Sequence, residues 1–208
     1  MKKAAIISGL IFIASALWAQ GTSSLEAVCE SLSSHPITTG DFIQTKTIQT
    51  NGRKLKSTGA YIISPEGIVW NTEKPISSSL ILTETAVVQV AANGKKSVLS
   101  GNDNQIFANI SETLSSVLSG NVTALKKNFN CEFTMDKSGE WTISLNPKDS
   151  TIASVMKTLV LSGTYQESAV MTSLVMLEAS GNTISYEFEN QKFPKELSAD
   201  EKKIFIVE

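Results

Sequence analysis

The side chains that most often carry enzymatic chemistry are sparse in this sequence. It contains one histidine, His35, directly before Pro36, and no serine lies in the Gly-x-Ser-x-Gly pattern of a hydrolase elbow. No histidines and cysteines have metal-binding spacing, and no Gly-rich loop matches a phosphate-binding pattern. Glu140 and Asp149 fall singly at predicted turns rather than as an acid–base pair. We therefore expect a protein that is not an enzyme and that uses neither a cofactor nor a metal.

The two cysteines leave two alternatives open. Cys29 and Cys131 are far apart in the sequence, and each falls on the apolar face of its predicted element. They either form a disulfide, which an oxidising compartment would favour, or remain free thiols that pack as small hydrophobic residues.

Length and charge exclude several classes of protein. The 208 residues carry 18 Lys/Arg and 20 Asp/Glu, for a formal net charge of −2, and 41% of them are hydrophobic. That length favours one domain with its own core. The weakly acidic balance argues against a nucleic-acid-binding module, which needs a basic surface, and it indicates no polybasic membrane patch.

The N-terminus has the three-part pattern of an export signal. Two lysines precede an apolar run at residues 4–17, and the small residue Ala19 follows. The run of about 14 residues is shorter than the ~20 that span a bilayer as a helix. We predict that residues 1–19 are a signal peptide cleaved near Ala19 and that residues 20–208 form a single, soluble, exported domain. The alternative is an uncleaved N-terminal anchor.

Hydrophobic spacing predicts the elements of this domain. Ser23 and Glu26 fit a capping box at the start of a helix that ends at Pro36. Period-two alternation and turn residues such as Asn51-Gly52 then predict strands. The predicted strands are 42–48, 54–64, 68–72, 79–83, 86–90, 95–99, 129–135, 141–145, 158–165, 170–178 and 183–190, with an edge strand at 203–207, and the predicted helical segments are 102–117, 123–127 and 150–156. Short links imply antiparallel neighbours, so we expect a mainly β (α+β) fold in which one large sheet of about 10–11 strands curls and helices cover its concave face.

Alternation places large apolar side chains on one face of the predicted sheet. The predicted helix at 102–117 also has one apolar face. The apolar face of the sheet is either an ordinary core packed by the helices or a cavity under a helical lid, suited to acyl chains, since each buried CH₂ contributes about 0.8 kcal/mol. The candidate cavity residues are Phe42, Leu55, Tyr61, Ile63, Trp70, Leu80, Leu82, Val88, Ile106, Ile110, Leu114, Phe129, Phe133, Trp141 and Ile143.

Several short motifs resemble the LolA family, whose members are periplasmic carriers of outer-membrane lipoproteins. The motifs are Asp41-Phe42-Ile43-Gln44, Ser57-Thr58-Gly59-Ala60-Tyr61, Gly67-Ile68-Val69-Trp70, Lys74-Pro75, Leu118-Ser119-Gly120, Phe129, Trp141 to Pro147 and Gly163. The resemblance implies an incomplete antiparallel β-barrel with helices as a lid. It also implies a monomeric periplasmic protein that binds acylated lipoproteins or other lipids, receives them from an inner-membrane release complex and passes them to an outer-membrane acceptor.

One departure from the family pattern qualifies the predicted function. Well-studied branches have an arginine at the end of the second strand that hydrogen-bonds the lid, whereas this chain has Ile63-Ser64-Pro65-Glu66. The chain therefore looks like a divergent LolA-like branch. Our leading hypothesis is a carrier that shuttles lipoproteins from inner to outer membrane. The alternative is a periplasmic lipid- or glycolipid-binding or sensor module on the same fold, and an esterase built on His35 is the least favoured reading.

Overall fold

The computed structural model describes residues 24–83, 86–98, 112–113 and 115–206. The strands are β1 Thr38–Thr47, β2 Lys54–Ser64, β3 Gly67–Lys74, β4 Ser78–Leu82, β5 Val87–Ala91, β6 Lys96–Val98, β7 Phe129–Met135, β8 Glu140–Pro147, β9 Met156–Tyr165, β10 Ala169–Glu178 and β11 Thr183–Lys192. The helices are α1 Leu25–Ser33, α3 Val122–Asn128, α4 Ser150–Ala153 and α5 Ala199–Ile204, and residues 112–113 and 115–118 are also helical. No helix in these described ranges is long and apolar enough to cross a membrane.

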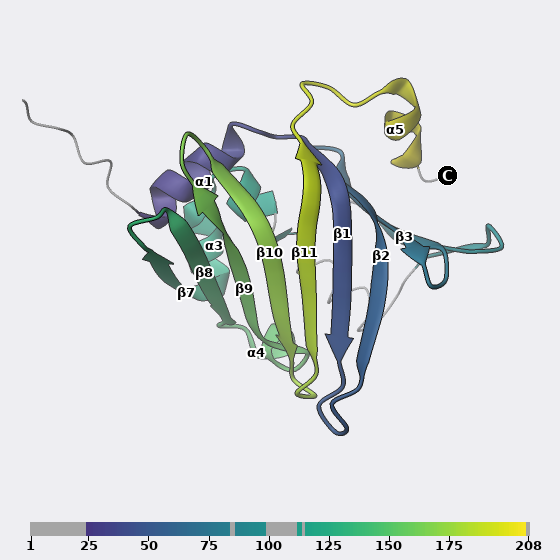
Figure 1. The fold of residues 1–208 in the computed structure, drawn as a ribbon, viewed down its shortest axis with the longest axis horizontal. Coiled ribbons are helices and arrows are strands. Elements are labelled where there is room, and N and C mark those ends of the chain that lie inside the picture. Colours follow the sequence, from purple (N-terminus) through teal and green to yellow (C-terminus); the bar gives the residue numbers. More distant parts are fainter. Residues whose placement is uncertain (1–23, 84–85, 99–111, 114, 207–208) are drawn as a thin grey trace, which may run out of the picture.

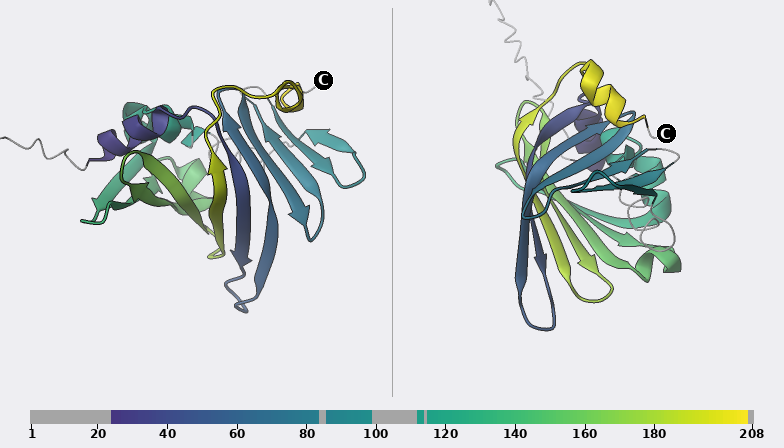
Figure 2. Two further views of the ribbon diagram at one scale, coloured as in Figure 1. Left: turned by 45° about the horizontal axis from the view of Figure 1, so that its top comes forward. Right: turned by 90° about the vertical axis from the view of Figure 1, so that its right-hand side faces the viewer.

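All eleven strands belong to one antiparallel sheet with the order β6-β5-β4-β3-β2-β1-β11-β10-β9-β8-β7. A first meander, β1 to β6, and a second, β7 to β11, join where β1 pairs with β11. Because β6 and β7 remain at the two edges, the sheet curls without closing (Figures 1 and 2). Helices lie inside the curl, where α1 packs on β10, α3 on β7, and α4 on β8 and β9. The predicted sheet of about ten or eleven strands, covered by helices on its concave face, is confirmed.

Several element ends differ from the prediction. The helix predicted at 150–156 ends at Ala153, and Met156 begins β9. The N-cap of α1 is Ser24 rather than Ser23, and its hydroxyl accepts a hydrogen bond of 3.1 Å from the Ala27 N–H. The edge strand predicted at 203–207 is wrong, because residues 203 and 204 belong to α5. A capping box between Ser198 and Glu201 starts that helix, and such a reciprocal cap satisfies two backbone donors that an edge strand would leave open.

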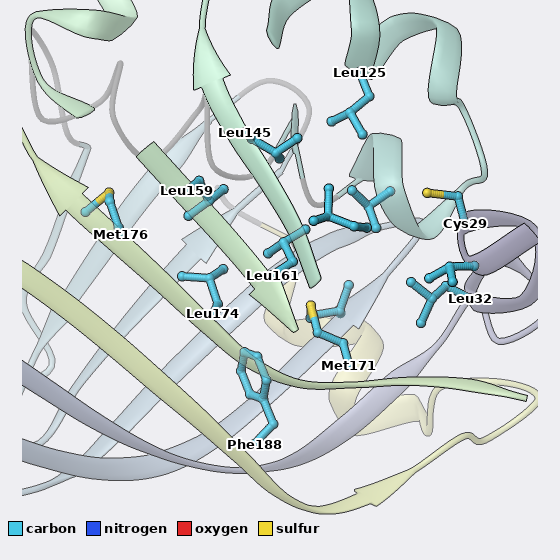
Figure 3. Packing of buried hydrophobic residues seen from close by; sticks show 14 of the residues in the cluster. Cys29, Leu32, Leu125, Leu145, Leu159, Leu161, Met171, Leu174, Met176 and Phe188 are labelled. Atoms are coloured by element: carbon cyan, nitrogen blue, oxygen red, sulfur yellow. The ribbon is translucent and has the colours of Figure 1, made fainter. Parts of the chain in front are cut away.

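The core extends over both meanders, and its densest part lies between the second meander and the helices (Figure 3). Alternate side chains of β8, β9 and β10 point toward α1 and α3 and are almost fully buried, among them Leu145, Leu159 and Leu161 at 0% exposure. From the helix side, Cys29 is 0% exposed and Leu125 is 1% exposed. This half of the concave face is therefore filled by the protein's own side chains.

A partly buried ion pair ties the two meanders together away from the core. Lys46 on β1 donates to the Glu178 carboxylate on β10 at 2.9 Å. Burial alone would raise the pKa of Glu178, but hydrogen bonds from Lys46, Asn182 and Ser180 outweigh it and hold that pKa below its usual value. The pair therefore favours the folded state when Glu178 is ionised.

We expect Lys46→Met to lower the free energy of unfolding by about 1 kcal/mol at neutral pH, since it leaves a half-buried carboxylate without its cation. A carboxyl whose folded pKa is depressed contributes stability above its unfolded pKa and loses it as the pH falls through the folded value. The difference between the proteins should therefore shrink below a pH of about 4.5, as measured by urea denaturation across pH. Lys56→Met, at an exposed lysine without an ion pair among the described residues, is the control; an equal loss in both variants would contradict the prediction.

Candidate functional site

A groove with a volume of about 1040 Å³ lies between the first meander and residues 112–119. The antiparallel direction of the strands explains its position. The β2–β3 and β4–β5 turns fall at the same end of the meander as the link from α1 to β1. Ile63, Ile68, Leu82 and Val87 form its apolar wall and are each 3–5% exposed, while Leu118 lines it from the helical segment. The volume of the groove is close to that of ligand-binding pockets in general.

The charged groups along the groove are both acidic. Glu66 in the β2–β3 turn and Glu112 in the helical segment line it, and no lysine or arginine is among its lining residues in the described part of the chain. The Asn128 amide donates to Glu112 at 3.2 Å, and both glutamates are exposed. The groove therefore offers an apolar wall with a polar, negatively charged mouth.

Five aromatic rings lie next to the groove on the concave face, three of them buried and two, Trp70 and Tyr186, partly exposed. This cluster comprises Phe42, Tyr61, Trp70, Tyr186 and Phe188, from β1, β2, β3 and β11. Trp70 is at its centre, with centroid distances of 5.4 Å to Tyr186, 6.2 Å to Tyr61, 6.4 Å to Phe42 and 6.5 Å to Phe188. Trp70 lies two positions after Ile68 on β3 and shares its face, so the cluster adjoins the groove wall.

The indole of Trp70 carries an unmatched polar group. Its Nε1 atom is buried and has no hydrogen-bond partner among the described residues. Leaving a buried donor unpaired costs about 1–3 kcal/mol, and native proteins satisfy nearly all such groups. Beside the two tyrosine hydroxyls, this N–H is the polar group that the cluster offers, and it can anchor a carbonyl oxygen.

The two tyrosines of the cluster stay neutral at physiological pH. Desolvation raises the pKa of Tyr186 to about 12. Desolvation, reinforced by the nearby Asp41 carboxylate, also raises the pKa of Tyr61. The aromatic cluster therefore contains no charged group.

The structure divides the predicted cavity residues into groups. Phe42, Leu55, Tyr61, Ile63, Trp70, Leu80 and Leu82 share the concave face of the first meander, by the register of β1 to β4. Only Ile63 and Leu82 of these line the groove, and Leu55 is 42% exposed. Phe129, Phe133, Trp141 and Ile143 pack in or against the core of the second meander, while Ile106, Ile110 and Leu114 lie outside the described residues.

The prediction that Val88 points into the cavity is wrong. Val88 pairs with Ile81, and Ile81 pairs with Val69, so these three residues lie on the outer face, opposite Trp70 and Leu80. They are nevertheless only 1%, 6% and 3% exposed. Because both faces of the sheet are buried here, β5 is apolar at adjacent positions, and Val87 takes the inward position instead.

Several lining residues were missed by the sequence reasoning. Pro36, Glu66, Thr83, Glu112 and Ser119 border the groove from turns and the helical segment rather than from strand faces, and Ser64 borders it from the end of β2. Turns carry no periodic signal that identifies a site. The available signal was topological, since in an antiparallel meander every second turn returns to the same end.

The two cysteines and the single histidine do not line the groove. Both thiols are free, as in the second of the two alternatives; desolvation raises the pKa of Cys29 to about 12 and also raises that of Cys131. The His35 ring packs on Phe193 with a centroid distance of 4.5 Å. Among the described residues, no group of His, Cys, Asp and Glu side chains is arranged to hold a metal ion.

Comparison with known proteins identifies similar sequences and folds. The family model described as "Outer membrane lipoprotein carrier protein LolA" matches residues 35–204, whereas no curated protein matches the sequence. A LolA superfamily protein from Nitrosomonas europaea is 9% identical, with a TM-score of 0.47 over 88% of this chain and 98% of its own. A putative outer membrane lipoprotein-sorting protein domain from Vibrio parahaemolyticus is 8% identical, with a TM-score of 0.46 over 88% and 99%. The Mycobacterium tuberculosis lipoprotein LppX is 9% identical, with a TM-score of 0.41 over 84% and 98%.

Proposed function

The chain belongs to the LolA family of outer membrane lipoprotein carrier proteins, and from this premise we propose that it binds the acyl chains of lipoproteins or related lipids on its concave face. The acyl chains enter the groove at Glu66 and Glu112 and extend over the aromatic cluster around Trp70. The protein acts as a carrier and catalyses no reaction.

The observation that carries this proposal is the large groove beside the first meander. One buried hydrophobic cluster includes residues of both meanders, but the space of about 1040 Å³ has its apolar wall on the first meander, at Ile63, Ile68, Leu82 and Val87. Each methylene buried there contributes about 0.8 kcal/mol, so a chain of ten or more is held by area alone.

The family supports a particular setting for this activity. Residues 1–19 act as a signal peptide, and residues 20–208 form one carrier domain that works in the periplasm as a monomer. The carrier takes cargo from an inner-membrane release complex and gives it to an outer-membrane acceptor. The candidate cavity residues Phe42, Tyr61 and Trp70 contact the acyl chains, together with the groove residues that strand alternation did not identify.

The acidic mouth limits the charge that the polar part of the cargo can carry. The end of β2 presents Glu66 and no arginine, and a second carboxylate, Glu112, lines the same groove. Two carboxylates repel an anionic headgroup, so the structure is suited to lipoproteins, glycolipids or other lipids whose polar part is neutral or cationic.

Mass spectrometry of the lipids and lipoproteins that copurify with the protein from its own host tests the proposal. We expect acylated molecules in stoichiometric amount, and we expect a fluorescent fatty-acyl probe to bind the delipidated protein. Absence of copurifying lipid together with no binding of acyl probe or lipoprotein at saturating concentration would overturn the proposal.

A pair of substitutions at Trp70 separates its ring from its N–H. Trp70→Phe keeps an aromatic ring and removes the unpaired donor, so we expect affinity for an ester-containing diacyl probe to fall about fivefold, the effect of one hydrogen bond. Affinity for a matched ether-linked probe should change less than twofold, and Trp70→Ala should weaken both. Fluorescence titration of the two probes measures this, and equal losses for ester and ether probes in Trp70→Phe would contradict a role for the N–H.

A further inference from the structure

The near-neutral net charge of the chain conceals a strong separation of charge. Residues 48–57, 73–77 and 91–98 contain the β1–β2, β3–β4 and β5–β6 turns with the adjoining strand ends, and we call them the basic margin. It holds six of the 18 Lys/Arg residues, namely Arg53, Lys54, Lys56, Lys74, Lys95 and Lys96, against the single carboxylate Glu73. All six cations are exposed, and none forms an ion pair with any residue that the structure describes.

Strand order brings these segments together. The three hairpins are consecutive in the sheet, and in an antiparallel meander their turns fall at the same end of the strands. Figure 2 shows the turns following one another along one margin of the curled sheet. Three segments that are well separated in the sequence therefore form one continuous basic surface.

Exposed aliphatic side chains accompany the cations. Leu55, between Lys54 and Lys56, is 42% exposed; Ile76, two positions after Lys74, is 72% exposed; and Val98, two positions after Lys96, is 70% exposed. Half of the six large hydrophobic residues that are exposed in the described chain thus lie in the basic margin. Lysines on an edge strand such as β6 also prevent edge-to-edge pairing, but Leu55 and Ile76 do not lie on an edge strand.

We propose that the basic margin docks the protein reversibly on a membrane surface rich in anionic lipid. Lysine and arginine beside an anionic leaflet are attracted to its headgroups, and aliphatic side chains between them enter the interface. An acidic protein would match the cations without needing three exposed aliphatic groups, and single-stranded nucleic acid is bound with aromatic platforms, which the margin lacks.

Docking in this way fixes the orientation of the groove. The groove is lined by the β2–β3 and β4–β5 turns. These turns lie at the end of the strands opposite the basic margin. The two ends are well separated, because the 11 residues of β2 span about 36 Å. The mouth with Glu66 and Glu112 therefore faces away from the bilayer. This inference does not depend on the proposed cargo, because it rests on the opposite end of the sheet.

Vesicle co-sedimentation tests the docking. We expect the protein to bind vesicles with about 30% phosphatidylglycerol in phosphatidylcholine at about 0.05 M salt, and to be released at about 0.5 M salt, where screening is strong. Binding to pure phosphatidylcholine vesicles should be at least tenfold weaker. A protein that binds neither kind of vesicle, or both equally, overturns the proposal.

Two matched charge-reversal variants locate the surface. Arg53→Glu, Lys54→Glu and Lys56→Glu together should weaken binding at least tenfold. The control variant Lys192→Glu, Lys195→Glu and Lys202→Glu makes the same change in net charge at exposed positions outside the margin and should bind within about threefold of the unmodified protein. Equal losses in both variants would show that net charge alone drives binding and would overturn the proposal.

A third variant separates a membrane from an acidic protein as the partner. Ile76→Ser and Val98→Ser together keep every cation and change no candidate cavity residue, and we expect binding to anionic vesicles to fall at least fivefold. Unchanged binding would overturn the membrane assignment and leave a surface for an acidic protein. All variants have the same N-terminal residues as the unmodified protein, so the apolar run at residues 4–17 does not affect the comparison. All variants should also keep the affinity of the unmodified protein for a fatty-acyl probe. A failure of docking and a failure of cargo binding are therefore distinguishable.

Discussion

Gly163→Ala is expected to lower the free energy of unfolding by about 3 kcal/mol or more. Gly163 lies on β9 opposite Trp141 of β8, and an added Cβ would be 1.9 Å from the Val170 carbonyl oxygen and 2.5 Å from the Trp141 indole. The indole is 1% exposed, and its N–H donates to the Thr164 carbonyl at 3.0 Å. Neither the backbone of β10 nor this ring can move without disturbing the core, and overpacking of this kind typically costs 1–3 kcal/mol, occasionally more.

Urea denaturation followed by tryptophan fluorescence measures this effect, and the melting temperature should fall by about 6–12 °C. Gly52→Ala is the matched control, because Gly52 lies in the β1–β2 turn at φ +66° with nothing within 4 Å of an added Cβ. That variant should lose about 1 kcal/mol from its backbone conformation alone. Equal losses at the two glycines would show that the close approach of Trp141 to β9 is unimportant for stability.

Blocking the groove is expected to weaken acyl binding more than tenfold while leaving the fold intact. Ser115 and Ser119 both line the groove, and the Ser119 N–H donates to the Ser115 carbonyl at 2.9 Å, so they lie one helical turn apart. Tryptophan at both positions would occupy space that the acyl chain needs. Excluding only two methylenes costs about 1.6 kcal/mol, which corresponds to more than a tenfold loss of affinity.

A matched pair of substitutions controls for the two added indoles. Thr123 and Lys127 are exposed on α3 with the same four-residue spacing, and neither lines the groove. The double variant Thr123→Trp, Lys127→Trp should therefore bind the probe within about twofold of the unmodified protein. If Ser115→Trp, Ser119→Trp binds as tightly as this control, the acyl chains occupy another surface. Unchanged urea denaturation of both variants would show that the comparison reports on binding.

Much of the fold could be predicted because alternation is a local property of the chain. The bounds of β2 and β7 agree with the predicted strands at 54–64 and 129–135. The chain turns at Asn51-Gly52 as predicted, with Gly52 at φ +66°. The loop is longer than the two-residue turn that Asn-Gly favours, because the Ile48 N–H donates to the Arg53 carbonyl at 2.9 Å and residues 49–52 lie between them. The inward positions of β1 to β4 followed from the same alternation.

Prediction failed where both faces of an element are buried or where a local cap competed with strand propensity. At Val87-Val88 both residues are apolar and buried, so the pairing of β5 with β4, rather than hydrophobicity, decides which one points inward. At the C-terminus, the Ser198–Glu201 capping box starts α5 in place of an edge strand. In both cases the deciding contacts cannot be read from the hydrophobic periodicity of the sequence.

The sequence by itself determined the class of the fold, the family resemblance and the scarcity of catalytic side chains, since each depends on residue types and on spacing within one element. Only the tertiary structure decided which end of the sheet holds the groove and which holds the basic margin. Glu66 and Glu112 line one space because the β2–β3 turn and the helical segment meet there, and three separate hairpins place Arg53, Lys74 and Lys96 along one margin. The physical reason is that strand order and direction bring together residues far apart in the chain, and a net charge of −2 says nothing about where the charges gather.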